Sequence, residues 1–152
     1  MSTEEQKQSL DSWFAEYDGL SMKGDVEGMA DMAIFPVHVV TESSDGNGYT
    51  ENWTRDRFVQ TMTEAMKATP KDMEMKAVRT PFFLSQDLAV VITDAEITVG
   101  AQTQVMRYAD ILVKMDGQWK FQTMAQSGWG DMLRAKKPAY TGLPGVAAGQ
   151  TR

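Results

Sequence analysis

The chain has 152 residues and a formal net charge of −6, and 42% of its residues are hydrophobic. This length suits a single domain that buries about two-thirds of its unfolded surface. The acidic balance argues against a nucleic-acid partner, because contacts to phosphates need clustered Lys and Arg.

The chain contains no cysteine, and His38 is its one histidine. These counts exclude a disulfide, a thiolate nucleophile and a histidine-rich zinc site. No apolar run approaches the roughly 18–20 residues of a membrane span, and the acidic N-terminus does not look like a signal peptide. We therefore expect a cytoplasmic protein that uses neither a metal nor a cofactor.

Three helices are predicted in the first half of the chain. Ser2 and Glu5 form a capping-box pattern, so a helix should begin there. Asp25 is a cap for a short second helix, and Thr54 is a cap for a third helix at 55–68. The first helix places four apolar residues on one face: Leu10, Trp13, Phe14 and Tyr17.

The remaining segments have the composition of β-strands. Residues 34–41 and 49–53 flank a turn rich in Gly, Asp, Asn and Ser. Four longer strands are expected at 72–84, 87–99, 102–115 and 118–127. The sequence therefore predicts an α+β domain at 1–130. An extension at 131–152 should pack on the domain or on a partner subunit.

Side chains alternate between the two faces of a strand. The parity of a residue, that is, whether its number is odd or even, therefore decides whether it faces the helices. The odd positions of the last three strands are the more apolar set, and we assign them to the interior. This places Thr93, Arg107, Ala109 and Thr123 inside. It places Asp94, Glu96 and Asp110 outside.

The parity depends on the hairpin that contains Asp116 and Gly117. A three-residue loop followed by a bulge keeps odd residues opposite odd residues. A tight two-residue Asp-Gly turn instead brings Trp119 to the face of Leu112 and Lys114. If the parity is reversed, Asp94 and Asp110 become the best acid–base pair.

The small residues on the odd face leave room for helix side chains, with a ligand pocket at the mouth. Three residues are candidates for chemistry: His38 as base or acid, Arg107 as the group that holds an anion, and Tyr17 as hydrogen-bond donor. The candidate ligand-binding residues are Trp13, Phe14, Trp53, Phe58, Met62, Thr93, Ala109 and Thr123.

The order and spacing of four segments resemble those of a known superfamily. The segments are Lys23-Gly24-Asp25, Phe35-Pro36-Val37-His38, Leu88-Ala89-Val90-Val91 and 112–120. Over about 5–130 the chain resembles the nuclear-transport-factor-2-like (NTF2-like) superfamily, in its ketosteroid-isomerase and SnoaL-like polyketide-cyclase branch. The resemblance implies a cone-shaped, curved mixed or antiparallel sheet wrapped around N-terminal helices, a cystatin-like barrel with an apolar pocket.

The resemblance also implies a function for the pocket. We expect it to bind a small hydrophobic molecule and, if the protein is an enzyme, to perform cofactor-free isomerase, lyase (dehydratase) or hydrolase chemistry. Tyr17 matches the tyrosine of the isomerase pattern, whereas Arg107 or Thr123 stands where an acid is wanted.

The alternative is a non-enzymatic homodimeric assembly domain whose pocket is filled by its own side chains. A pocket below roughly 300 Å³ favours that alternative. In either case the resemblance implies a homodimer that forms through the sheet. The residues expected on its outer face are Met106, Tyr108, Leu112 and Met124.

Overall fold

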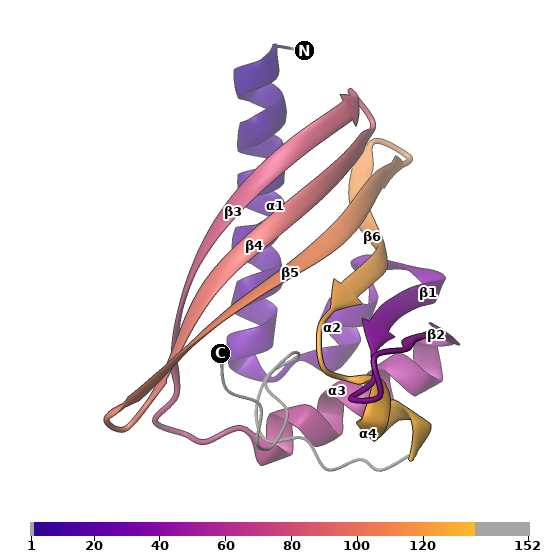
Figure 1. Ribbon diagram of the computed structural model, residues 1–152. Helices are drawn as coiled ribbons and strands as arrows, with labels where there is room; N and C mark the ends of the chain where they lie inside the picture. The colour runs from indigo at the N-terminus through magenta and orange to yellow at the C-terminus, as the bar shows by residue number, and fades with distance from the viewer. Residues whose placement is uncertain (1, 136–152) are drawn as a thin grey trace.

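Helices cover one face of a curved six-stranded sheet in the computed structural model, which describes residues 2–135 (Figure 1). The α+β class is as predicted, and most of the predicted extension lies outside the described residues. The elements are α1 (Thr3–Lys23), α2 (Val26–Ala30), β1 (Ala33–Glu42), β2 (Gly48–Trp53), α3 (Arg55–Ala68), β3 (Glu74–Ser85), β4 (Leu88–Val99), β5 (Gln102–Met115), β6 (Gln118–Gln126) and α4 (Gly130–Arg134).

Capping side chains fix where the two long helices begin. The Glu5 backbone N–H donates to Ser2 Oγ at 3.2 Å, and the Ser2 N–H donates to Glu5 Oε2 at 2.9 Å. This reciprocal pair is the predicted capping box. At α3 the Thr54 hydroxyl accepts from the Arg57 N–H at 3.2 Å. Both helices therefore begin at the residues that the sequence pattern marks.

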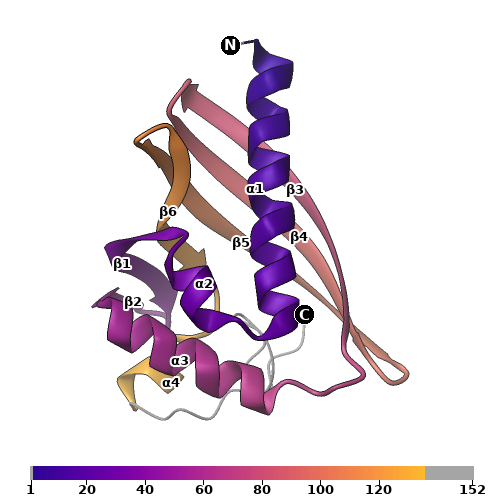
Figure 2. The same cartoon turned by 180° about the vertical axis from the view of Figure 1, so that it is seen from behind.

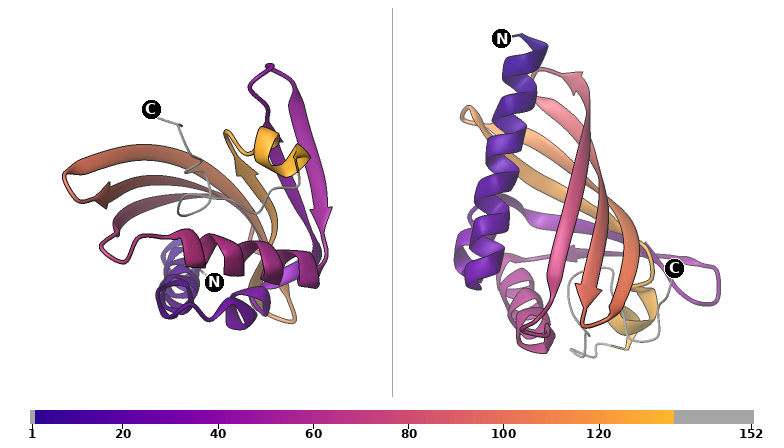
Figure 3. Two further views of the ribbon diagram at one scale, coloured as in Figure 1. Left: turned by 90° about the horizontal axis from the view of Figure 1, so that it is seen from below. Right: turned by 90° about the vertical axis from the view of Figure 1, so that its left-hand side faces the viewer.

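The sheet has the strand order β2-β1-β6-β5-β4-β3. All neighbouring strands are antiparallel except β1 and β6, which are parallel. The predicted mixed, curved sheet is therefore present, but β2 and β3 are free edges and the barrel is not closed. Figures 2 and 3 show α1 lying across the inner face of β3, β4 and β5, with α2 and α3 beside β1.

The β5–β6 hairpin has a two-residue turn, so the predicted three-residue loop is wrong. Met115 pairs with Gln118, and Asp116 and Gly117 have φ values of 52° and 79°. Positive φ at both central residues is the geometry of a type I′ turn, which Asp-Gly favours. The β4–β5 hairpin is equally tight, since Val99 pairs with Gln102.

These two turns reverse the parity that we assigned to β5. On β4 the odd residues do face the core, as predicted, and Ala89, Val91 and Thr93 are fully buried. In the register Thr93 pairs with Tyr108, and Val91 pairs with Asp110. The inward residues of β5 are therefore even: Met106, Tyr108, Asp110 and Leu112.

A bulge in β6 changes its parity once more. Leu112 pairs with Phe121, but the preceding Ile111 pairs with Thr123, so Gln122 is the extra residue. One extra residue moves all later side chains to the opposite face. Trp119 and Phe121 therefore point inwards before the bulge. Met124 and Gln126 point inwards after it.

Helix α1 is fastened to the sheet by two tryptophans. Trp13 Nε1 donates to the Trp119 carbonyl at 2.8 Å, and Trp119 Nε1 donates to Ser9 Oγ at 3.0 Å. Both rings are buried, and each polar N–H has a partner there. This packing fixes the position of α1 over β5 and β6.

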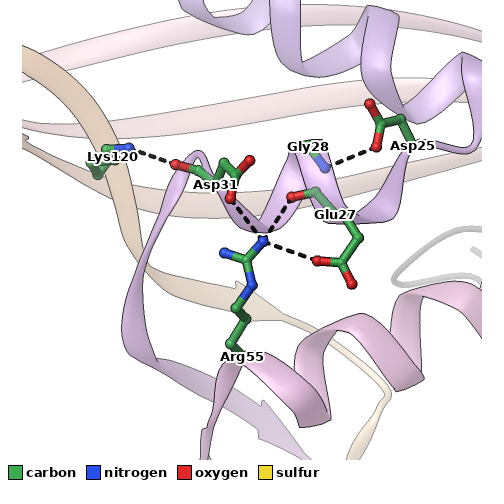
Figure 4. A network of polar contacts seen from close by, with 6 residues as sticks. All are labelled: Asp25, Glu27, Gly28, Asp31, Arg55 and Lys120. Atoms are coloured by element: carbon green, nitrogen blue, oxygen red, sulfur yellow. Dashed lines mark hydrogen bonds and ion pairs between the residues drawn. The ribbon is translucent and has the colours of Figure 1, made fainter.

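Helix α2 is held in place by a polar network on the surface (Figure 4). Arg55 of α3 reaches Glu27 at 3.0 Å and Asp31 at 2.7 Å. Lys120 of β6 donates to the Asp31 carbonyl oxygen at 2.5 Å. Exposed ion pairs stabilise little on their own. The network orients α2 relative to α3 and β6.

The turn geometry predicts opposite effects of the same substitution at two open glycines. Neither Gly19 nor Gly117 has any atom within 4 Å of an added Cβ, but Gly117 has positive φ. Gly19→Ala should raise the free energy of unfolding by about 0.5–1 kcal/mol, because Ala is the better helix former. Gly117→Ala should lower it by about 1 kcal/mol. Urea denaturation measures both, and a stabilising Gly117→Ala would contradict the type I′ turn.

Candidate functional site

A small cavity lies between α1 and the inner face of the sheet. Its volume is about 90 Å³, and its lining combines apolar walls with a few polar groups. The volume is below the roughly 300–1,000 Å³ of drug-sized ligand pockets. The apolar walls come mainly from Trp13, Phe14, Met29, Met62, Met106 and Met124.

Asp110 is one of the ionisable groups in the cavity wall. It lies on β5 between Val91 of β4 and Met124 of β6. Part of the residue stays accessible through the cavity, but protein atoms surround the carboxyl group. Among the described residues none donates a hydrogen bond to it.

Burial raises the pKa of Asp110 to about 7. The nearby Arg79 guanidinium lowers this pKa, and the Asp18 carboxylate raises it. Desolvation is the dominant cause, because it penalises the charged form of an acid. Asp110 therefore changes its protonation state near neutral pH, where a group can both give and take a proton.

Two tyrosines lie close to Asp110. Tyr17 of α1 stacks on Trp13 with ring centroids 5.3 Å apart and meets the edge of Phe121 at 5.5 Å. Burial, and then the Asp110 charge, raise the pKa of Tyr17 and of Tyr108. Both phenols therefore keep their protons at neutral pH and remain hydrogen-bond donors.

An ion pair lies at the β3 side of the cavity. Arg79 donates from Nη1 to Asp18 Oδ2 at 2.5 Å and from Nη2 to Asp18 Oδ1 at 3.1 Å. The guanidinium also lies 4.4 Å from the Phe14 ring centroid. This two-pronged geometry holds the arginine firmly. The positive charge of Arg79 is thus matched by Asp18 within the site.

The structure brings some of the predicted ligand-binding residues together at the cavity. Its lining includes the predicted ligand-binding residues Trp13, Phe14, Met62 and Ala109, together with Tyr17, the predicted hydrogen-bond donor. Ala109 has an odd position on β5, so its side chain faces outwards, against the predicted parity. Trp53, Phe58 and Thr93 are fully buried in the core, outside the cavity wall. The roles predicted for these eight residues stay predictions.

The predicted positions of His38, Arg107 and Thr123 in the pocket wall are wrong. Arg107 lies on the outer face, where its Nε donates to Asp94 at 2.6 Å. His38 pairs in register with Thr123, and Val37 and Val39 on either side of it point into the core. The tight hairpins turn Arg107 outwards, and the bulge in β6 does the same to Thr123.

The same reversal corrects the residues expected at a sheet-to-sheet interface. Met106, Leu112 and Met124 are buried beneath the helices, and Tyr108 lines the cavity. They cannot form an outer surface. Asp94 and Glu96 do lie outside, as predicted, whereas Asp110 lies inside.

The predicted parity places three polar residues of the cavity outside, namely Tyr108, Asp110 and Gln126, and the predicted site also omits Asp18, Ser21 and Arg79. The signal that finds Tyr108 and Asp110 is the Asp116-Gly117 dipeptide, because Asp-Gly is among the strongest sequence marks of a two-residue hairpin. With that turn, Asp110 and Tyr108 move inwards. The bulge that turns Gln126 inwards has no comparable mark in the sequence.

No protein-family model matches the sequence, and no curated protein matches it. Solved structures do match its fold. A proposed scytalone dehydratase from Novosphingobium aromaticivorans has a TM-score of 0.60 and 18% identity, over 78% of this chain and 80% of its own. An NTF2-like protein of unknown function from Pseudomonas putida has a TM-score of 0.63 and 15% identity, with coverages of 82% and 87%.

A third similar structure has a different assigned role. It is a proposed calcium/calmodulin-dependent protein kinase II association domain from Xanthomonas campestris, with a TM-score of 0.55 and 16% identity. The match covers 78% of this chain and 84% of that one. At these identities the similarity establishes the fold, which is NTF2-like, and leaves the activity open.

Two kinds of feature are absent from residues 2–135. No helix in this part is long and apolar enough to cross a membrane. No three His, Asp or Glu side chains in it gather into a metal-binding group. The cytoplasmic location and the absence of a cofactor stay predictions.

The raised pKa of Asp110 predicts how stability changes with pH. The unfolded chain loses this proton near pH 4, whereas the folded chain keeps it until about pH 7. Between these values the folded state binds more protons, so stability falls as pH rises. Asp110→Asn removes this contribution. It should gain up to about 4 kcal/mol relative to wild type between pH 4 and pH 8.

Urea denaturation at several pH values measures the difference. Met124→Leu is a matched control, because Met124 lies opposite Asp110 on β6 and carries no ionisable group. It should leave the pH dependence unchanged. Parallel stability curves for wild type and Asp110→Asn would contradict the raised pKa.

Proposed function

We propose that the cavity beneath α1 binds a small, largely apolar molecule and that Asp110 transfers a proton to or from it without a cofactor. The observation that carries this proposal is a carboxyl group enclosed by protein atoms in an apolar cavity wall, where burial raises its pKa to about 7. A buried carboxyl without a hydrogen-bond donor costs stability, and such groups cluster at functional sites. The reaction class is isomerisation, dehydration or addition of water.

The polar neighbours of Asp110 fit this chemistry. Below about pH 7 the neutral acid can donate a proton, and above it the carboxylate can accept one. Tyr17 and Tyr108 offer hydroxyl donors to an oxygen that gains negative charge during the reaction. Asp18 neutralises the charge of Arg79, so this pair adds no net charge to the cavity. His38 and Arg107 have no part in the proposal, because both lie on the outer face.

The size of the cavity limits the ligand. Apolar cavities of roughly 150 Å³ accept benzene, and this one measures about 90 Å³. Five of its lining residues are methionines, namely Met29, Met62, Met75, Met106 and Met124. Methionine is flexible and repacks readily. We therefore expect a ligand of only a few non-hydrogen atoms, with larger ones admitted as methionines move.

The similar structures agree with this class of reaction. One of them is named as a proposed scytalone dehydratase. Dehydration needs an acid or base that works near neutral pH, which is the property proposed for Asp110. The likeness supports the proposal and does not identify a substrate.

Proton transfer can be tested without knowing the substrate. A panel of small, weakly acidic carbon compounds is incubated with the protein in D₂O, and NMR detects deuterium incorporation. Wild type should accelerate exchange for at least one compound, with a rate that rises through about pH 7. Asp110→Asn should lose about 100-fold or more. Tyr17→Phe should lose about tenfold, as expected for one hydrogen-bond donor.

Outer-face variants are the controls for this experiment. His38→Gln and Arg107→Gln should retain full exchange activity, since neither residue reaches the cavity. Exchange that survives in Asp110→Asn but is lost in His38→Gln would overturn the assignment.

A second candidate is a non-enzymatic homodimeric assembly domain, and two observations favour it. The cavity is small and walled by the chain's own methionines. The outer face of the sheet also exposes large apolar side chains, with Val78 68%, Phe82 54% and Val105 54% exposed. Phe82 is in register with Val90 of β4, and Val90 with Ile111 of β5, so an apolar row crosses this face.

The homodimer predicts a measurable mass. Light scattering should give twice the chain mass for wild type and the single-chain mass for Phe82→Asp, which puts a charge in the apolar row. Met22→Asp is the control, because Met22 is 89% exposed on α1, away from the sheet. A monomeric wild type at micromolar concentration would remove the assembly candidate.

A further inference from the structure

Four inward residues form a polar row across four strands beneath α1. Arg79 of β3 pairs with Thr93 of β4, Thr93 pairs with Tyr108 of β5, and Tyr108 pairs with Gln126 of β6. Three of these residues also line the cavity: Arg79, Tyr108 and Gln126. The neighbouring row holds Asp110, so the acid and the polar row share one face.

The row contains buried groups that have no hydrogen-bond partner among the described residues. They are Arg79 Nε, Thr93 Oγ1 and Gln126 Nε2. A buried polar group without a partner costs about 1–3 kcal/mol, so each such group needs an explanation. Gln126 is 7% exposed and lies in the cavity wall. Its buried amide nitrogen lacks a partner, and an oxygen of a ligand in the cavity would supply one.

The placement of Gln126 relative to Asp110 fits one small ligand. Gln126 pairs with Tyr108, and Asp110 pairs with Met124, so Asp110 and Gln126 are diagonal neighbours on adjacent strands. Diagonal neighbours on one face lie about 7 Å apart. A ligand oxygen held by Gln126 therefore brings the adjoining carbon atoms towards the Asp110 carboxyl.

The charges around the row indicate that the ligand is neutral. An anionic ligand needs an unpaired cation when it leaves water. Arg79 has the only cationic side chain among the described residues that line the cavity, and Asp18 already takes both of its Nη groups. Asp110, when ionised, adds a further negative charge. The row thus offers donors without a net positive charge.

We infer that Gln126 is a specificity-determining residue that donates a hydrogen bond to the oxygen of a small uncharged ligand, such as a ketone. The inference rests on the proposed ligand-binding function of the cavity. It adds the chemical class of the ligand: an apolar body that carries one accepting oxygen. Amide donors in apolar pockets discriminate strongly in this way, because their hydrogen bond is lost with the wrong ligand.

Three probes of similar shape test the inference at pH 7: cyclopentanone, methylenecyclopentane and cyclopentanecarboxylate. Labelled methionine methyl groups report binding by NMR, since five methionines line the cavity. Binding is measured for wild type, for Gln126→Leu and for Gln118→Leu. The last is a matched control, because Gln118 is an exposed glutamine on the same strand.

The decisive quantity is the ratio of the ketone and hydrocarbon dissociation constants. Gln126→Leu should shift this ratio towards the hydrocarbon by about five- to tenfold, the effect of one hydrogen bond. Gln118→Leu should leave it unchanged. The carboxylate should bind at least tenfold more weakly than the ketone.

Each other result contradicts a different statement. If the ratio of the ketone and hydrocarbon dissociation constants is the same for wild type and Gln126→Leu, Gln126 does not bind the ligand oxygen. The proposal of a ligand pocket is then unaffected. If the carboxylate binds best, the ligand is anionic, and the inference that it is uncharged is wrong. If none of the probes perturbs a cavity methionine, both this inference and the proposed ligand-binding function fail.

Discussion

The two-residue turn at Asp116 and Gly117 determines which side chains of β5 and β6 face the helices. Alternation along a strand is strict, so one residue more or less in a hairpin moves a whole set of side chains to the other face. The type I′ turn, together with the equally tight β4–β5 hairpin, directs Asp110 and Tyr108 beneath α1. The bulge at Gln122 then adds Gln126 to the same face. The polar half of the cavity depends on these local features of the backbone.

The apolar half depends on how α1 packs against the sheet. Trp13 and Trp119 fasten the helix to β6 by two hydrogen bonds that tie buried indole groups to the main chain and to Ser9. The helix thereby covers Asp110 with Trp13, Phe14 and Tyr17. Removing water from a carboxyl group raises its pKa, so the fold supplies a weak acid near pH 7. The cost of this burial is balanced by the large apolar core around it.

Much of the fold follows from the sequence, because local signals specify it. Ser2 with Glu5, and Thr54, mark the starts of α1 and α3. The candidate site was harder to predict. Its polar residues depend on hairpin length and on a bulge. The odd positions of β5 are the more apolar set, which predicts that they face the core, but they face outwards. Ile111 and Val113 there face outwards, where an apolar surface remains.

The proposed chemistry depends on one property of the site, which is that the Asp110 carboxyl is a neutral-pH acid in the cavity wall. The most direct measurement is an NMR titration of the ¹³C signal of that carboxyl group in the folded protein. If burial raises the pKa of Asp110, the midpoint should lie near pH 7. A midpoint near 4, the value of an aspartate in water, would show that the group is solvated and would remove the basis of the proposed chemistry.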